Sequence, residues 1–256
     1  MEIILNIVPT DRYSKNTTNT VPNRYRALKG KSTMKRVFPT KATLLKEAGK
    51  SYVVFPEGQG TAVMLADKLY HTTGDKAGQR VQLTDKLLDT IGAPQPGEGW
   101  YASEKYDGLR GIWTGKELIS RPSKEKGSKT FRGKVFNFVP ESFLRLLPPG
   151  VALDGEIWMG RGKFQKVAGL SNLKVTPKQT EEYISTLWDD VVFKVFDSPS
   201  TPGPYEERMK VVGSLLGTDP RVQLVDSYLV KNDEHLMDLY KKLTSSGAEG
   251  LMLRAP

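Results

Sequence analysis

Short strand-like runs of apolar residues, separated by polar and turn-forming residues, occupy much of the chain after residue 100. Such runs, bounded by turn signals, are typical of β-strands. Thr114, Gly115 and Lys116 form a hairpin-turn signal between two of these runs. The pattern predicts strands at residues 100–105, 109–114, 117–121, 151–159, 191–197, 222–225 and 250–254.

Three further segments have a helical pattern with start or stop residues at their ends. Residues 205–216 follow Pro204, and residues 233–246 follow Asn232, which is a preferred N-cap residue. A third helix is predicted at residues 83–91, ahead of a Pro- and Gly-rich link. Strands and helices mix without the regular βαβ alternation of a doubly wound sheet. The pattern therefore favours an α+β fold with antiparallel sheets flanked by helices.

The positive charge is concentrated near the amino terminus. The 256 residues carry a net charge of +9, and residues 1–50 contain eleven Lys and Arg against three Asp and Glu. No acid occurs between Arg12 and Lys46. We expect residues 1–59 to form a basic, partly disordered arm and residues 60–256 to form a domain. The arm could bind nucleic acid, direct the chain to an organelle or be a solvated tail, and its composition leaves all three open.

The composition excludes several kinds of site. The chain has no Cys and only two His, which excludes a disulfide framework, a thiolate nucleophile and a cysteine-ligated metal, and leaves little room for a His-centred triad. No Gly-Lys pair has the surrounding glycine and Ser or Thr of a P-loop. No apolar run is long enough to span a membrane, so we expect a soluble protein with no membrane partner.

Lys105 is the first candidate for covalent chemistry. It ends a predicted strand and is followed by a turn that contains Asp107 and Gly108. A lysine amine can act as a nucleophile when it is deprotonated near a polarising group or a metal ion. An ordinary exposed lysine before a turn has the same pattern, and K-x-D-G arises by chance in about one chain in twenty of this length. Lys105 alone therefore leaves both interpretations open.

Acidic residues enter three of the predicted apolar strands. Asp154 and Glu156 fall on the same face of one strand, where burial is costly unless the carboxylates bind a cation or accept hydrogen bonds. Phe196 and Asp197 place a ring and an acid at the end of another strand, and Glu249 precedes a third. Core packing or an edge-strand position would also explain each of these features in isolation.

Taken in order, these segments resemble the motifs of the covalent nucleotidyltransferase superfamily, and most closely those of the ATP-dependent DNA ligases. The resemblance covers about residues 60–256. Segments 153–161 and 203–209 are similar to the compact, minimal ligases. The matching segments are Lys105-Tyr-Asp-Gly-Leu-Arg110, Ser120-Arg121, Asp154-Gly-Glu156, Phe196-Asp197 and Glu249-Gly-Leu-Met-Leu-Arg254.

The resemblance implies an ATP-grasp-like nucleotidyltransferase domain in which Lys105 attacks the α-phosphate of ATP and becomes a lysyl-AMP. AMP would then pass to the 5′-phosphate at a nick in double-stranded DNA, and the 3′-hydroxyl would displace it. Mg²⁺ would be held with the help of Glu156 and Glu249. By position, the residues implied to bind the nucleotide are Arg110, Arg121, Glu156, Phe196 and Glu249.

A basic segment at residues 121–134 suggests where DNA phosphates would bind. It contains six Lys and Arg and a single acid, Glu125. Such a loop would hold phosphates without reading base sequence, although a solvated charged loop would have the same composition. The predicted DNA contacts are Lys124, Lys126, Lys129, Arg132 and Arg161.

The resemblance implies an intracellular protein that acts where DNA is, and leaves the nucleus, the cytoplasm and an organelle open. It also sets expectations for the carboxyl-terminal end. Ligases of this family continue into a strand with two further lysines and then an OB-fold domain, and both are absent from this sequence. Either the sequence is a fragment of a full-length protein that has the OB-fold domain, or another chain supplies these parts. We expect a monomer, and we expect residues 1–256 alone to adenylate themselves poorly and to seal nicks inefficiently. An RNA ligase, a GTP-using mRNA-capping enzyme and a catalytically silent nucleic-acid-binding module remain alternatives.

Overall fold

The computed structural model describes four amino-terminal strands, residues 97–124, 130–171 and 180–256, and the single residue 173. The helix predicted at residues 83–91 lies outside the part of the chain that the structure describes. Within that part, three sheets and five helices form a mixed α+β fold, as the sequence pattern predicted. None of the described helices is long and apolar enough to cross a membrane.

The first sheet contains the strand that ends at Lys105. Its strands, in spatial order, are β13 (Ser227–Leu229), β5 (Tyr101–Lys105), β14 (Gly250–Arg254), β1 (Ile3–Asn6) and β4 (Ala66–Lys68). β5 is antiparallel to both of its neighbours, whereas β1 runs parallel to β14. The candidate nucleophile therefore lies on an interior strand beside the strand that follows Glu249.

The second sheet carries the other motif strands. In spatial order these are β12 (Val222–Leu224), β11 (Val192–Asp197), β10 (Leu153–Trp158), β6 (Leu109–Trp113) and β7 (Leu118–Ser120). All neighbours are antiparallel except β11 and β12. The prediction of antiparallel sheets is thus wrong at β11–β12 and at β1–β14. Helix α5 (Tyr205–Leu215) joins β11 to β12, and a crossover of this kind returns the chain in the same direction.

A third sheet consists of β2 (Thr43–Glu47), β3 (Lys50–Pro56), β9 (Thr130–Lys134) and β8 (Ser123–Lys124). Two of its strands come from the predicted basic arm, and β1 of the same arm belongs to the first sheet. Strands from both sides of residue 59 therefore share sheets. The division of the chain at this residue stays a prediction.

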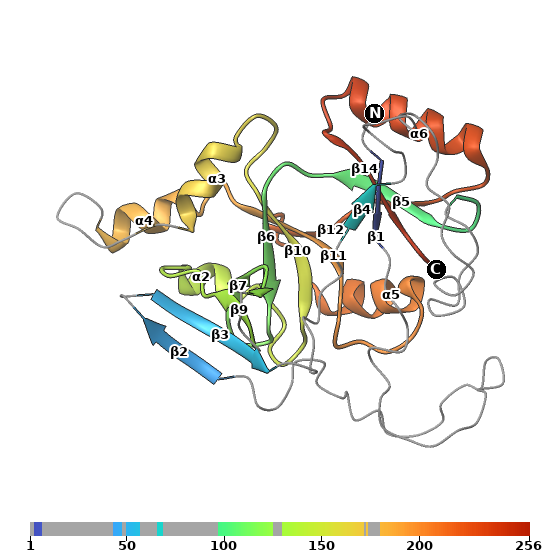
Figure 1. The fold of residues 1–256 in the computed structure, drawn as a ribbon. Helices are drawn as coiled ribbons and strands as arrows, with labels where there is room; N and C mark the ends of the chain where they lie inside the picture. Colours follow the sequence, from blue (N-terminus) through green and yellow to red (C-terminus); the bar gives the residue numbers. More distant parts are fainter. Residues whose placement is uncertain are drawn as a thin grey trace, which may run out of the picture.

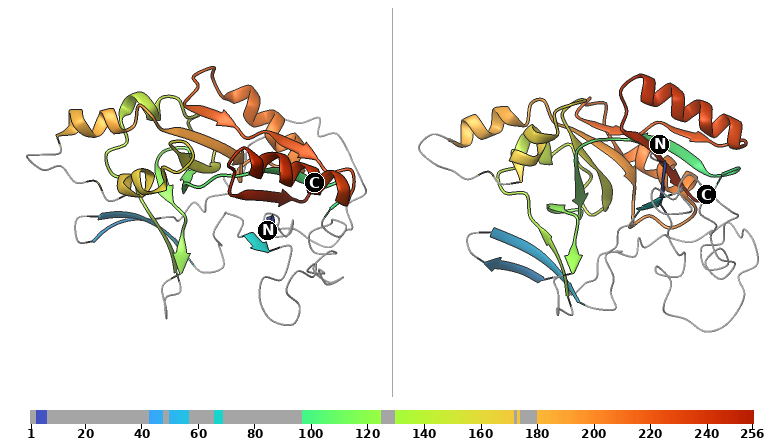
Figure 2. Two further views of the ribbon diagram at one scale, coloured as in Figure 1. Left: turned by 90° about the horizontal axis from the view of Figure 1, so that it is seen from above. Right: turned by 45° about the horizontal axis from the view of Figure 1, so that its top comes forward.

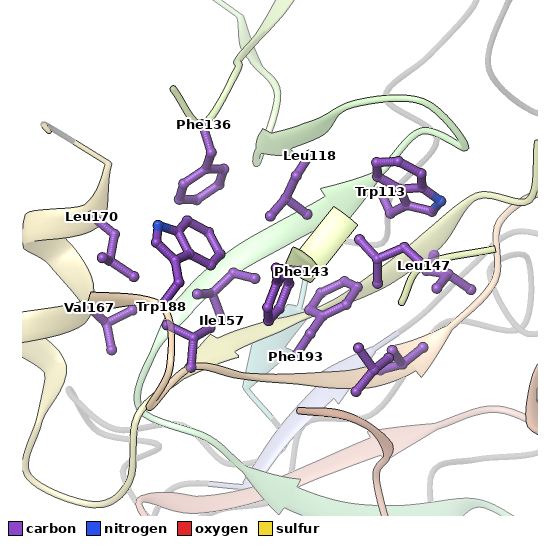
Figure 3. Close-up of a cluster of buried hydrophobic side chains, with 14 of the residues drawn as sticks. Trp113, Leu118, Phe136, Phe143, Leu147, Ile157, Val167, Leu170, Trp188 and Phe193 are labelled. Carbon is purple, nitrogen blue, oxygen red and sulfur yellow. The ribbon is translucent and has the colours of Figure 1, made fainter. Parts of the chain in front are cut away.

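A large hydrophobic cluster covers one face of the second sheet. Ile157 of β10 and Phe193 of β11 are register partners, and both side chains are fully buried. They pack in one cluster with Trp188, among other large side chains (Figure 3). Because side chains of a strand alternate between faces, the next register pair, Glu156 and Lys194, lies on the opposite face. The core therefore determines which residues of these strands can reach a site on the other face.

A second hydrophobic cluster packs α6 (Asp233–Ser245) against the first sheet. Leu236 and Leu239 of this helix belong to the same buried cluster as apolar residues of β5 and β14. The side chain of Asn232 accepts a hydrogen bond from the main-chain N–H of His235 at 2.8 Å, which confirms the predicted N-cap. Packing of α6 thereby fixes the strand that ends at Lys105 and the strand that follows Glu249.

The remaining helices lie at the other end of the molecule. Figure 1 shows α3 (Phe164–Leu170) and α4 (Glu181–Leu187) beyond the second sheet, far from α6, and α2 (Glu141–Leu144) near β7 and β9. The two views of Figure 2 show the same separation. The middle of the molecule is therefore formed by strands of the first and second sheets.

Candidate active site

A cavity of about 720 Å³ is lined by residues of both the first and the second sheet. Its walls include the end of β5, the turn that follows, and parts of β6, β10, β11 and β14. Nucleotide-sized ligands occupy cavities of this volume. All the residues that the motifs assigned to the nucleotide line it, namely Lys105, Arg110, Arg121, Glu156, Phe196 and Glu249.

Lys105 lies at the end of β5, and 19% of its side chain is exposed. Its ammonium group forms an ion pair with the carboxylate of Glu249. The strand register explains this pair, because Gly250 is opposite Lys105 in the antiparallel pairing of β5 with β14. The structure thus brings the candidate nucleophile into contact with one of the two predicted metal ligands.

The turn after Lys105 requires glycine at position 108. A Cβ atom on Gly108 would clash with the main-chain oxygen of Ile157 and would lie 2.9 Å from the side chain of Glu156. Glycine therefore allows the turn to pack directly against β10. Asp107 is exposed in this turn and lines the cavity. The glycine of the K-x-D-G pattern thus has a steric reason, because it lets the turn after Lys105 pack against the strand that carries Glu156.

Arg110 and Asp154 form a pair of charge-assisted hydrogen bonds at the wall of the cavity. The guanidinium donates from Nε to Oδ1 at 2.9 Å and from Nη2 to Oδ2 at 2.5 Å. Burial acts to lower the pKa of Arg110, but the Asp154 carboxylate outweighs it and the pKa is raised. Asp154 is fully buried and does not line the cavity. Of the two acids on β10, Asp154 therefore holds Arg110, and Glu156 faces the cavity.

Glu156 has no ion-pair or hydrogen-bond partner for its carboxylate within the described ranges. Burial raises its pKa to about 8, and the positive charge of Arg110 only partly opposes this. A cation or a hydrogen-bond donor that entered the cavity would stabilise the charged form. Glu156 is therefore a buried acid of the cavity wall that can gain a partner from a ligand.

Phe196 supplies an aromatic ring to the cavity wall, with 8% of the residue exposed. The guanidinium carbons of Arg110 and Arg254 lie 5.4 Å and 4.8 Å from the ring centroid, respectively. The neighbouring Asp197 accepts hydrogen bonds from Nε and Nη2 of Arg208 on α5, at 2.8 Å and 3.1 Å. The ring of the Phe-Asp motif thus faces the cavity, whereas its acid is anchored to a helix.

Comparison with known protein families distinguishes among the enzyme classes that share a K-x-D-G lysine. Residues 79–256, well over half of the chain, match the family described as the ATP dependent DNA ligase domain. The chain belongs to this family. Every motif from Lys105 to Arg254 lies within the matched residues, and the resemblance to ATP-dependent DNA ligases inferred from those motifs is confirmed.

Individual DNA ligases are similar to the ligase domain at moderate identity. A DNA ligase of Haemophilus influenzae is 28% identical over 164 residues, which are 63% of this chain and 53% of the relative. The chain therefore spans about half the length of the curated relative it matches. A solved Lig E DNA ligase, studied for DNA binding with a minimal scaffold, is 28% identical with a TM-score of 0.49. The match covers 62% of this chain and 56% of the Lig E chain. The ATP-dependent DNA ligase of bacteriophage T7 in complex with ATP is 22% identical with a TM-score of 0.41, and the match covers 68% of this chain and 61% of the T7 chain.

The two acids of the ligase domain that the motifs assign to a divalent ion, Glu156 and Glu249, both line the cavity, and Glu249 is paired there with Lys105. No described group of three or more His, Cys, Asp or Glu side chains is arranged to hold a metal by itself. Mg²⁺ usually keeps several waters and binds through one or two carboxylates together with substrate phosphates. The donor set therefore fits a Mg²⁺ ion held mainly by a polyphosphate, and it does not fit a protein-only metal cage.

The structure places only part of the predicted DNA-binding set. Arg161 is exposed and forms an ion pair with Glu104 at 2.8 Å, and Glu104 immediately precedes Lys105. Arg132 is half-buried in β9, a strand of the third sheet. The ion pair of Arg161 at the cavity wall was not expected from the sequence. Lys124 ends β8, while its side chain and the whole of Lys126 and Lys129 lie outside the described residues.

Lys134, Met252 and Arg254 line the cavity, although none of them was among the residues assigned to the nucleotide from the sequence. Alternation along β14 places Met252 and Arg254 on the face that carries Gly250, beside the strand of Lys105, and this signal was available in the sequence. Lys134 gave no comparable signal. Its ammonium group contacts the main-chain oxygen of Ser171, a residue distant in the sequence.

Proposed function

We propose that this ligase domain forms a covalent lysyl-AMP at Lys105, with ATP as the AMP donor. The observation that supports this most directly is the convergence of Lys105 and the five residues assigned to the nucleotide on one cavity of about 720 Å³. These residues are separated by up to 144 positions, from Lys105 to Glu249, and come from two sheets. Membership of the ATP-dependent DNA ligase family supports the same reaction.

In the proposed step, the lone pair of the Lys105 amine attacks the α-phosphorus of ATP. A phosphorus–nitrogen bond forms, and the bond to the bridging oxygen breaks so that pyrophosphate leaves. Starting from the ammonium form, the nitrogen loses one proton before the attack and one after it, and both pass to solvent. The amine must be deprotonated to react. Its present partner is the Glu249 carboxylate, so Glu249 is positioned to orient Nζ at the cavity wall.

The other cavity residues bind and orient the nucleotide in this proposal. Phe196 provides a ring for stacking on the adenine, and Arg110 and Arg121 provide guanidinium donors for ribose and phosphate oxygens. Glu156 accepts from the ribose or assists the metal, and Glu249 assists the metal. Mg²⁺, when bound, would neutralise charge on the phosphates and favour attack at the α-phosphorus.

We further propose that the AMP group is passed to the 5′-phosphate at a nick in double-stranded DNA, and that the 3′-hydroxyl then forms the phosphodiester bond and releases AMP. Activation in this way turns the phosphate into an electrophile with a good leaving group. The DNA backbone would be held through salt-sensitive contacts with the basic residues of segment 121–134 and with Arg161. Because these steps belong to the whole ligase reaction, they need a separate test from adenylation.

Mass spectrometry of the purified chain after incubation with ATP and Mg²⁺ tests the first step. We expect the mass of one AMP group on the peptide that contains Lys105 and no such group in Lys105→Ala. Lys116→Ala is the matched control, because Lys116 is exposed in a hairpin turn and does not line the cavity. Absence of an adduct from the unmodified chain, or an adduct that survives in Lys105→Ala, would contradict the proposal.

Labelled GTP and substrates with DNA or RNA nicks separate the remaining alternatives. A DNA ligase should take AMP from ATP but not GMP from GTP, and it should transfer the AMP to nicked DNA in preference to nicked RNA. The expected poor sealing by residues 1–256 stays a prediction, which a gel assay of nick closure checks. Salt-sensitive DNA binding with no covalent adduct would instead support a catalytically silent binding module.

A further inference from the structure

Arg254, the last residue of β14, is a buried arginine in the wall of the cavity, with only 2% of its surface exposed. Its Nη1 donates to Ser103 Oγ on β5 at 2.6 Å. Its guanidinium carbon lies 4.8 Å from the ring centroid of Phe196 and 5.8 Å from that of Tyr205. Arg254 therefore connects the first sheet, which it shares with Ser103, to the aromatic ring that the second sheet contributes to the cavity.

The charge of Arg254 is balanced differently from that of the neighbouring arginines. Arg110 is paired with Asp154, and Arg208 is paired with Asp197. Within the described part of the chain Arg254 hydrogen-bonds to no carboxylate, and its buried Nε has no hydrogen-bond partner. Removing a guanidinium group from water is costly unless other interactions compensate. The direct contacts that remain are one hydroxyl group and two aromatic rings, and the Asp154 carboxylate, which pairs with Arg110, acts on the charge of Arg254 through space.

A desolvated guanidinium close to an aromatic ring is attracted by the negative potential of the ring face. The distance of 4.8 Å between Arg254 and Phe196 lies within the range of this interaction, and it is the shorter of the two cation contacts of the ring. With 2% exposure Arg254 offers almost no surface to a ligand, whereas Phe196 lines the cavity. Any influence of Arg254 on a bound nucleotide must therefore pass mainly through Phe196.

We propose that Arg254 is a positioning residue for the base-binding wall, because its guanidinium group fixes the Phe196 ring in the orientation that stacks on the purine of ATP. The inference rests on the proposed function, in which Phe196 contacts the base. The hydrogen bond to Ser103 holds the guanidinium on the first sheet, so the same contact sets the position of one cavity wall relative to the other.

Equilibrium binding to purified variants tests this role. The ligands are α,β-methylene-ATP, which cannot release pyrophosphate, and inorganic tripolyphosphate, which has no base. Arg254→Met removes the charge and keeps a long side chain, and Arg254→Lys keeps the charge but loses the planar group. Arg221→Met is the matched control, because Arg221 pairs with Asp219 and does not line the cavity.

We expect Arg254→Met to raise the Kd for α,β-methylene-ATP about tenfold, which corresponds to about 1.4 kcal/mol, and to change the Kd for tripolyphosphate less than about twofold. Arg254→Lys should have an intermediate effect, and Arg221→Met should have none. In a Phe196→Leu background, Arg254→Met should weaken binding little further, because its effect acts through the ring. Arg254→Lys provides the same ligand comparison if Arg254→Met does not fold.

Three results would overturn the positioning role: unchanged affinity for the ATP analogue, an equal loss of affinity for both ligands, or full additivity with Phe196→Leu. The proposed function fails in a different way, because the unmodified chain would then form no AMP adduct on Lys105. In that case the positioning role falls with it. An adduct on the unmodified chain together with any of the three results refutes the role of Arg254 alone.

Discussion

The pair formed by Arg110 and Asp154 provides a sensitive test of how the cavity wall is stabilised. Asp154→Asn keeps the shape of the side chain and removes its charge, so the Arg110 guanidinium loses its anionic partner. Asp154 is fully buried and accepts two hydrogen bonds, at 2.5 Å and 2.9 Å. Breaking one partner of such a buried pair costs about 3–5 kcal/mol of unfolding free energy. This is a large fraction of the roughly 5–15 kcal/mol that stabilises a typical domain.

Asp219→Asn is the matched control, since Asp219 and Arg221 form an ion pair whose side chains are 30% and 28% exposed. Exposed pairs contribute only about 0–1 kcal/mol. In urea denaturation followed by circular dichroism, a slope of about 2 kcal/mol per molar predicts a midpoint lowered by about 2 M for Asp154→Asn and by less than about 0.5 M for Asp219→Asn. Equal shifts for the two variants would refute the reasoning that burial makes the Arg110 pair important.

Three other changes have defined outcomes. Gly108→Ala should reduce the rate of AMP adduct formation at least about tenfold, because its Cβ would clash with β10, whereas Gly169→Ala, which meets nothing within 4 Å, should leave the rate unchanged. Trp188→Ala should lower the free energy of unfolding by about 3–5 kcal/mol in the same urea assay, since Trp188 is 1% exposed in the main hydrophobic cluster. Arg161→Gln should weaken binding to nicked DNA and reduce the slope of log Kd against log salt by about one, as a filter-binding titration would show, and an unchanged slope would exclude a phosphate contact.

The sequence alone determined the type and approximate place of most elements near the site. Short strand-like runs of apolar residues located β5, β6, β10, β11 and β14, and the residues at helix ends located α5 and α6. The order of the motifs was enough to identify the ligase family and to select the residues that converge on the cavity. Local signals of this kind are reliable because periodicity, capping and turn formation depend on neighbouring residues.

The tertiary structure decided which partner each charged side chain has. Asp154 and Glu156 have the same place in the strand pattern, but one holds Arg110 and the other faces the cavity. Arg254 looked like the end of an apolar strand and proved to lie against Phe196. The parallel pairing of β1 with β14, between the two ends of the chain, was also invisible in the pattern. Such contacts depend on strand register and on how separate sheets pack, and these are set by interactions between residues far apart in the sequence.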